Sequence, residues 1–261
     1  MRHIESADGT LIAVEELGSG PPVVLLPGAM NDRGRLLPLA AALSALGLRG
    51  VTIDRRARGD STDEAGGLAS AVEREVDDVR AIVADLGDEV TLLGYSSGGI
   101  LALAAALAGV PARRLVVLEA PVVVPSAPPR DPAVGPQLEA LVRGGDHAAA
   151  VELYQSRVVG LPPHLASGQR DQPWFRAIQA IAPSLLYDWA VTDRYPDAGA
   201  FSTLSLPALV VRARETWPVL AESASAVVGA LPDARLELVE GRDHEPDPGA
   251  VAAAIATFVG P

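Results

Sequence analysis

The chain contains no cysteine and no lysine, and these two absences exclude several kinds of chemistry. Without cysteine there is no disulfide, no thiol nucleophile and no cysteine-ligated metal. Because every basic residue is arginine, neither a Schiff-base lysine nor a P-loop lysine is available. No histidine or acid cluster has metal-ligand spacing and no G-x-G-x-x-G follows a strand, so we predict no metal and no cofactor.

Long hydrophobic runs and excess positive charge are also missing. No stretch reaches the roughly eighteen apolar residues of a membrane span, and no apolar signal-peptide core follows Met1. The net charge is −12, from 33 acids against 21 bases, which disfavours nucleic acid and anionic membranes as partners. We therefore expect a cytoplasmic monomer or homodimer. The charged run at 54–58 is predicted to be a solvated loop, with binding of a substrate carboxylate by its arginines as the alternative.

Short apolar runs alternate with amphipathic helical patterns along most of the chain. Continuous apolar strands separated by helices predict a mostly parallel, doubly wound α/β sheet. The alternation breaks over a proline-rich stretch with helical patches and then resumes, which predicts a core formed by 1–121 and 204–261 and a helical cap inserted at 122–203. The predicted strands are 3–6, 11–17, 23–26, 48–53, 90–93, 115–118, 208–211 and 235–239.

Residues 94–98 form a G-x-S-x-G pattern centred on Ser96. The pattern lies between the predicted strand 90–93 and an alanine- and leucine-rich helix at 100–108. In this strand–turn–helix context the serine occupies a sharp turn that lifts its hydroxyl above the sheet, beside the positive end of the helix. We predict that Ser96 is a nucleophile. An ordinary glycine-rich connection is the alternative.

A serine nucleophile needs a histidine base, which itself needs an orienting acid. With this motif the chain order is serine, acid, histidine, and the histidine follows the last strand. Of the four histidines, only His244 lies just after the strand predicted at 235–239. We therefore predict His244 as the base and assign structural roles to His3, His147 and His164, with a place in the lining of the pocket as the alternative for His164.

The serine motif, the order of elements and the position of the insertion together resemble the capped α/β-hydrolase superfamily, and this resemblance covers the whole chain. More narrowly, the sequence is similar in several places to the zearalenone lactone hydrolases. These places are Pro27 in the predicted oxyanion loop, the Ser-Ser-Gly within 94–98, and Glu119 after the sixth strand. Residues 187–190 are similar to a cap segment whose tryptophan contacts the lactone there, which would correspond to Trp189.

The resemblance leaves two candidates for the acid. Relatives usually carry an aspartate after the strand that follows the cap, but here Thr216 stands at that position and Glu215 lies one residue before it. Glu119 ends the preceding strand, which is the alternative site for the acid in this fold. A buried carboxylate needs a partner, so we favour Glu119 over Glu215. A role for Glu119 in capping nearby backbone is a third reading.

An oxyanion hole needs two backbone N–H groups aimed at one point. Ser97, directly after the nucleophile, is predicted to supply one of them. The other is predicted to come from Ala29, with Met30 nearby. Pro27 replaces the histidine that many relatives carry in this loop.

Aromatic residues are scarce and unevenly placed. The chain has ten, and seven of them lie between residues 154 and 201. This enrichment predicts an apolar pocket where the cap meets the core, although some of these rings must fill the core of the cap itself. The predicted substrate-binding side chains are Met30, Tyr95, Tyr154, Tyr187, Trp189 and Trp217.

Together these features predict a serine hydrolase that cleaves an ester or lactone of a small hydrophobic molecule through an acyl-enzyme. Carbon–carbon bond hydrolysis by the same residues is one alternative. A non-hydrolytic isomerase, epimerase or small-molecule binder is another, because the acid is missing from its usual position.

Overall fold

A nine-stranded sheet forms the centre of the computed structural model, which describes residues 1–63, 66–87, 89–127 and 130–260. The strand order is β1-β2-β4-β3-β5-β6-β7-β8-β9, and neighbours from β4 to β8 run parallel. The strands are β1 (Arg2–Glu5), β2 (Leu11–Leu17), β3 (Pro22–Leu26), β4 (Arg49–Ile53), β5 (Thr91–Tyr95), β6 (Arg114–Leu118), β7 (Ala208–Glu215), β8 (Ala234–Arg242) and β9 (Glu245–Pro246).

Helices cover both faces of the sheet, which confirms the predicted doubly wound arrangement. Alternate side chains of one strand enter different layers: Val24 packs with α2, α3 and α9, whereas Val23 packs with α1 and α10. The helices of these two layers are α1 (Leu37–Ala45), α2 (Ala71–Leu86), α3 (Ser97–Leu107), α9 (Pro218–Ala230) and α10 (Pro248–Val259), with the 3₁₀ turn η1 (Arg33–Leu36) before α1.

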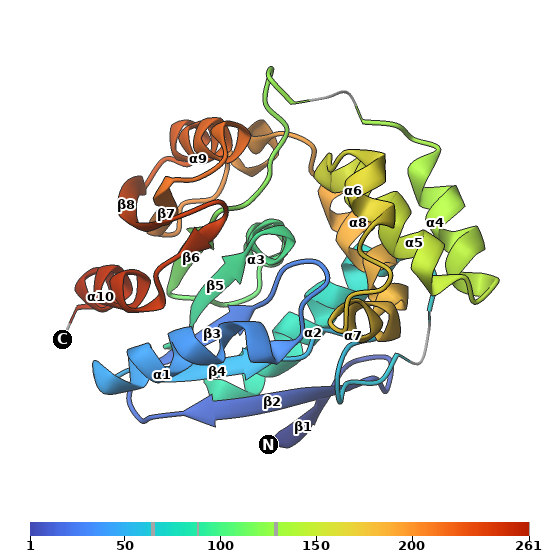
Figure 1. Ribbon diagram of the computed structural model, residues 1–261. Coiled ribbons are helices and arrows are strands. Elements are labelled where there is room, and N and C mark those ends of the chain that lie inside the picture. The colour runs from blue at the N-terminus through green and yellow to red at the C-terminus, as the bar shows by residue number, and fades with distance from the viewer. Residues whose placement is uncertain (64–65, 88, 128–129, 261) are drawn as a thin grey trace.

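The segment 122–203, between β6 and β7, contains helices that gather on one side of the molecule (Figure 1). We call it the inserted segment. Its first helices share an apolar cluster of their own, whereas Val191 and Phe201 near its end pack into the core layer of α2 and α3. Its elements are α4 (Val134–Arg143), α5 (His147–Tyr154), the π turn η2 (Gln155–Val159), α6 (Pro163–Ser167), α7 (Phe175–Ala180), η3 (Ala182–Ser184), α8 (Leu185–Arg194) and η4 (Ala198–Phe201).

Most predicted elements lie within a few residues of the observed ones. The β1–β2 hairpin turns at Asp8 and Gly9, where the positive φ of Gly9 (86°) suits a tight turn. A short β8–β9 hairpin was not predicted. In the described part of the chain, no helix is long and apolar enough to cross a membrane.

Candidate active site

Ser96 lies at the turn between β5 and α3, at the carboxyl end of a central strand. Its φ of 56° and ψ of −126° are unfavourable for a residue with a Cβ. The N–H of Ser96 donates to the carbonyl of Leu118 on β6 at 2.9 Å, and this hydrogen bond fixes the turn. Gly28 lies directly against it, since a Cβ on Gly28 would come within 2.7 Å of the Ser96 Cβ. This close approach requires glycine at position 28.

His244 and Glu119 form the hydrogen-bonded pair that a serine nucleophile needs. The distance from His244 Nδ1 to Glu119 Oε2 is 2.6 Å, and the Glu119 side chain is fully buried. Two further donors hold the carboxylate: the N–H of Ala213 at 2.7 Å and the hydroxyl of Thr216 at 2.9 Å. Glu215, the alternative acid, has a side chain that is 73% exposed and faces Arg242.

These donors determine the protonation state of the pair. Burial raises the pKa of Glu119, but hydrogen bonds from His244, Ala213 and Thr216 outweigh burial and lower the pKa below its ordinary value. The carboxylate is therefore ionised and can only accept hydrogen bonds. It follows that Nδ1 of His244 carries a proton and that Nε2 is the nitrogen available to act as a base.

His244 occupies the tight turn between β8 and β9. Asp243 and His244 have φ values of 48° and 67°, and the residues on either side, Arg242 and Glu245, pair across the hairpin. Positive φ at both central positions is typical of a type I′ turn, in which Asp is favoured and His is tolerated. The neighbouring Asp243 therefore has a conformational role, while its N–H donates to the carbonyl of Glu215 at 3.1 Å.

Two aromatic rings flank the imidazole of His244. Tyr95 stacks on it with a centroid distance of 4.9 Å, and Trp217 lies 5.4 Å away at a tilt of 31°. The Tyr95 hydroxyl also donates to the carbonyl of His244 at 2.8 Å. Burial raises the pKa of Tyr95 to about 12, so this donor stays protonated at neutral pH. Tyr95 was predicted to bind substrate; in the structure its ring and hydroxyl contact His244 and Arg35.

Unfavourable backbone conformations concentrate around this pair. Among the described residues, seven that are not glycine have positive φ, and five of these are in or beside the site. Such strain persists only where the surrounding structure enforces it, which is common at functional sites. The five are Met30, Ser96, Glu119, Asp243 and His244.

The predicted oxyanion donors are both near neighbours of Ser96 through the chain: Ser97 follows it directly, and Ala29 follows Gly28, which lies against the Ser96 side chain. Ser97 begins α3, and its own hydroxyl is directed away to Asp188 on α8 at 2.7 Å. Ala29 and Met30 are half-buried in the loop after β3 and pack against the apolar cluster of the inserted segment. The side chain of Asn31 donates to the carbonyl of Ala29 at 2.6 Å, which fixes this loop.

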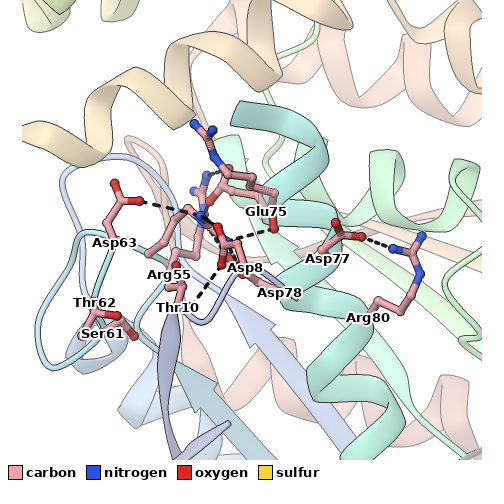
Figure 2. Close-up of polar contacts among 12 residues, drawn as sticks. Asp8, Thr10, Arg55, Ser61, Thr62, Asp63, Glu75, Asp77, Asp78 and Arg80 are labelled. Carbon is pink, nitrogen blue, oxygen red and sulfur yellow. Dashed lines mark hydrogen bonds and ion pairs between the residues drawn. The ribbon is translucent and has the colours of Figure 1, made fainter. Parts of the chain in front are cut away.

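The charged run at 54–58 is buried, so the prediction of a solvated loop is wrong. Arg55, Arg56 and Arg58 are each at most 2% exposed, and Asp54 is fully buried. Figure 2 shows Arg55 directed toward α2, where Glu75 binds it through two hydrogen bonds of 2.7 Å. The missed signal is the pattern of α2, in which two acids, Glu75 and Asp78, fall on its otherwise apolar face.

Several aromatic side chains predicted to bind substrate have structural contacts instead. Tyr154 is 2% exposed within the apolar cluster of the inserted segment. Tyr187 is 1% exposed, and its hydroxyl donates to the carboxylate of Asp63 at 2.8 Å. Trp189 packs so closely on α4 that a Cβ at Gly135 would lie 2.5 Å from its ring. Aromatic enrichment here mainly reflects the packing of the inserted segment.

A cavity of about 720 Å³ lies among α4, α5 and α6, on the inserted segment. It is lined by Leu141, Leu153 and His164 among others, and it is separate from Ser96 and His244. In the described ranges, no group of three or more histidine, aspartate or glutamate side chains is arranged to hold a metal ion.

Comparison with known proteins identifies the family and the fold. A sequence model described as the alpha/beta hydrolase family matches residues 23–254. An alpha/beta hydrolase from Sphaerobacter thermophilus DSM 20745 is 36% identical over 99% of this chain and 100% of its own, with a TM-score of 0.89. An esterase from Exiguobacterium antarcticum (21% identity, 99% and 98% covered, TM-score 0.74) and a thermophilic esterase from Thermogutta terrifontis (20%, 98% and 97%, 0.71) share the fold. The predicted fold is therefore confirmed.

Proposed function

This chain belongs to the alpha/beta hydrolase family, and we propose that it cleaves an ester or lactone of a small hydrophobic molecule through an acyl-enzyme. The observation that carries the proposal is the 2.6 Å pair between His244 and the buried Glu119. Tyr95, the residue just before the strained turn at Ser96, stacks on the imidazole of this pair. A structural histidine needs neither a buried anion on Nδ1 nor a nucleophile turn close by.

The proposed reaction begins when Ser96 attacks the carbonyl carbon of the substrate. His244 Nε2 accepts the serine proton, and ionised Glu119 stabilises the imidazolium that forms. The N–H groups of Ala29 and Ser97 donate to the oxyanion. The proton then passes to the leaving oxygen, and the bond to the alcohol breaks. Water attacks the acyl-enzyme in the same way and releases the acid.

The substrate class is proposed from two apolar side chains, Trp217 and Met30. Trp217 is 36% exposed beside the imidazole, and Met30 is half-buried in the oxyanion loop. Both are apolar, which favours a hydrophobic acyl or alcohol group. The similarity of 187–190 to zearalenone lactone hydrolases supports a lactone, but the packing of Trp189 against Gly135 weakens that particular link.

A fluorophosphonate probe and p-nitrophenyl esters test the proposal directly. We expect the probe to label Ser96 and expect Ser96→Ala to remain folded while losing several orders of magnitude in kcat, on the scale of other triad knockouts. A pre-steady-state burst of p-nitrophenol would report the acyl-enzyme. A folded wild-type protein that is not labelled would contradict the proposal and favour a non-hydrolytic role.

A further inference from the structure

We propose that Arg58, held by Asp188 of the inserted segment, orients and polarises the peptide that carries the first oxyanion donor. The inference rests on the proposed function, because it concerns the N–H groups of Ala29 and Ser97. It assigns positioning roles to Arg58 and Asp188, two buried charged residues that are not members of the proposed triad of serine, histidine and glutamate.

Arg58 donates hydrogen bonds to two carbonyl groups of the oxyanion loop, which is the loop after β3 that carries Ala29. Its Nη1 donates to the carbonyl of Gly28 at 2.6 Å and to that of Asn31 at 2.9 Å. The carbonyl of Gly28 and the N–H of Ala29 belong to one peptide unit, and in a planar trans peptide they point in opposite directions. Holding the carbonyl on Arg58 therefore directs the N–H of Ala29 to the other side of the loop. The adjacent cation also polarises this peptide and strengthens its N–H as a donor.

Asp188 connects this arrangement to the second donor. Its Oδ2 accepts from Arg58 Nη2 at 2.8 Å, and its Oδ1 accepts from the hydroxyl of Ser97 at 2.7 Å. The same Oδ1 accepts from Arg55 Nη1 at 2.7 Å, and that nitrogen also donates to the carbonyl of Pro27 at 3.0 Å. One carboxylate on α8 thus supports both residues that flank Ser96 in the proposed oxyanion hole.

The cluster is stable only when α8 is docked on the core. Arg55 and Arg58 are each at most 2% exposed, and their charges are balanced by Glu75 and Asp188. Without Asp188 the two arginines would share one carboxylate, leaving a buried positive charge uncompensated, which proteins avoid. Ala29 and Met30 also pack on the apolar cluster of the inserted segment. Docking of α8 and assembly of the oxyanion hole are therefore coupled.

Asp188→Asn tests the inference, with Asp78→Asn as its matched control. Asp78 is also buried and pairs at 2.6 Å with Arg56, from the same loop, but the contacts of Arg56 are to Asp8, Asp63, Asp78 and the carbonyl of Arg74 rather than to the oxyanion loop. Both changes remove one buried carboxylate charge from an arginine of the 55–58 loop. Of the two aspartates, only Asp188 is hydrogen-bonded to a residue of the proposed oxyanion hole, Ser97.

We expect Asp188→Asn to lower kcat for p-nitrophenyl acetate and the rate of fluorophosphonate labelling about 10- to 100-fold, somewhat less than the loss of an entire oxyanion donor. KM should change less than about threefold, because the interaction acts in the transition state. The midpoint of the pH–rate profile should stay in place, since the pair of Glu119 and His244 is intact. Asp78→Asn should remain within about threefold of wild type in both rates.

A folded Asp188→Asn with the same rates as Asp78→Asn would overturn the inference. If Asp188→Asn does not fold, Arg58→Lys decides: it keeps a cation opposite Asp188 but lacks the fork that reaches both Asp188 and Gly28. A similar loss in kcat supports the inference, and wild-type rates overturn it. Absence of labelling in the wild type would instead overturn the proposed function, and this inference with it.

Discussion

The hydroxyl of Thr216 donates a hydrogen bond of 2.9 Å to the carboxylate of Glu119. Thr216 occupies the position where the resemblance leads us to expect the acid, and its hydroxyl supports Glu119, the acid that we propose, at the end of the neighbouring strand. The carboxylate is the same one that binds His244. With Glu119 as the proposed acid, the histidine has an anionic partner from the end of β6, which weakens the argument for a non-hydrolytic role.

Replacing the two candidate acids one at a time distinguishes them. Glu119→Gln keeps the shape of the side chain but removes the charge that stabilises the imidazolium, so kcat should fall about 10²- to 10⁴-fold. Glu215→Gln is the matched control on an exposed loop and should change kcat less than about threefold. Steady-state kinetics on p-nitrophenyl esters, with melting temperatures for both variants, provides the measurement. If Glu215→Gln lost kcat and Glu119→Gln kept the wild-type kcat, Glu215 would be the acid.

The lowered pKa of Glu119 also predicts how stability depends on pH. As the pH falls toward this pKa, the folded state binds fewer protons at Glu119 than the unfolded state does. The charge of Glu119 therefore stabilises the fold above the ordinary glutamate pKa, and this contribution is lost as the pH falls through the lowered value. Thermal unfolding of wild type and Glu119→Gln should show a larger difference at pH 7 than at pH 3. An equal difference at both pH values would contradict this prediction.

Gly28→Ala should disrupt catalysis because of the contact with Ser96. The added Cβ would lie 2.7 Å from the Ser96 Cβ, so the oxyanion loop or the nucleophile turn must move. Displacements of about 1 Å at a reacting group can cost on the order of 100-fold in rate. Gly229→Ala, inside α9 with nothing within 4 Å of the new Cβ, is the control and should raise stability by up to about 1 kcal/mol. Equal activities of the two variants would show that the loop adapts.

The two tryptophans predicted to bind substrate should respond differently to truncation. Trp217→Ala removes an exposed ring beside His244 and should impair bulky aromatic esters more than acetate esters. Trp189→Ala removes a ring packed against Gly135 and should mainly lower the melting temperature. Comparing kcat/KM for p-nitrophenyl acetate and a bulky aromatic ester checks both. Equal losses on the two esters for Trp217→Ala would place Trp217 outside the substrate site.

The fold and the serine turn followed from the sequence because their signals are local. Apolar runs of strand length predicted β3, β5 and β6, and the glycine-rich turn after β5 predicted the position of Ser96. The order of residues along the chain likewise singled out His244 after β8. For the strands and the serine turn, a stretch of no more than about twenty residues carries the pattern, as expected for hydrophobic periodicity and turn chemistry. His244 was predicted from its place in the order of elements along the whole chain.

Only the tertiary structure decided which charges are buried and which residues they bind. From the sequence, Arg58 lies in a hydrophilic loop, because its carboxylate partner Asp188 is 130 residues away on α8. The sequence favoured Glu119 over Glu215 as the acid, but only the structure shows that Glu119, at the end of β6, lies 2.6 Å from His244, which follows β8. Burial of a charge is favourable only when its partners converge in space. Sequence spacing alone does not encode that convergence, since packing of distant elements creates it.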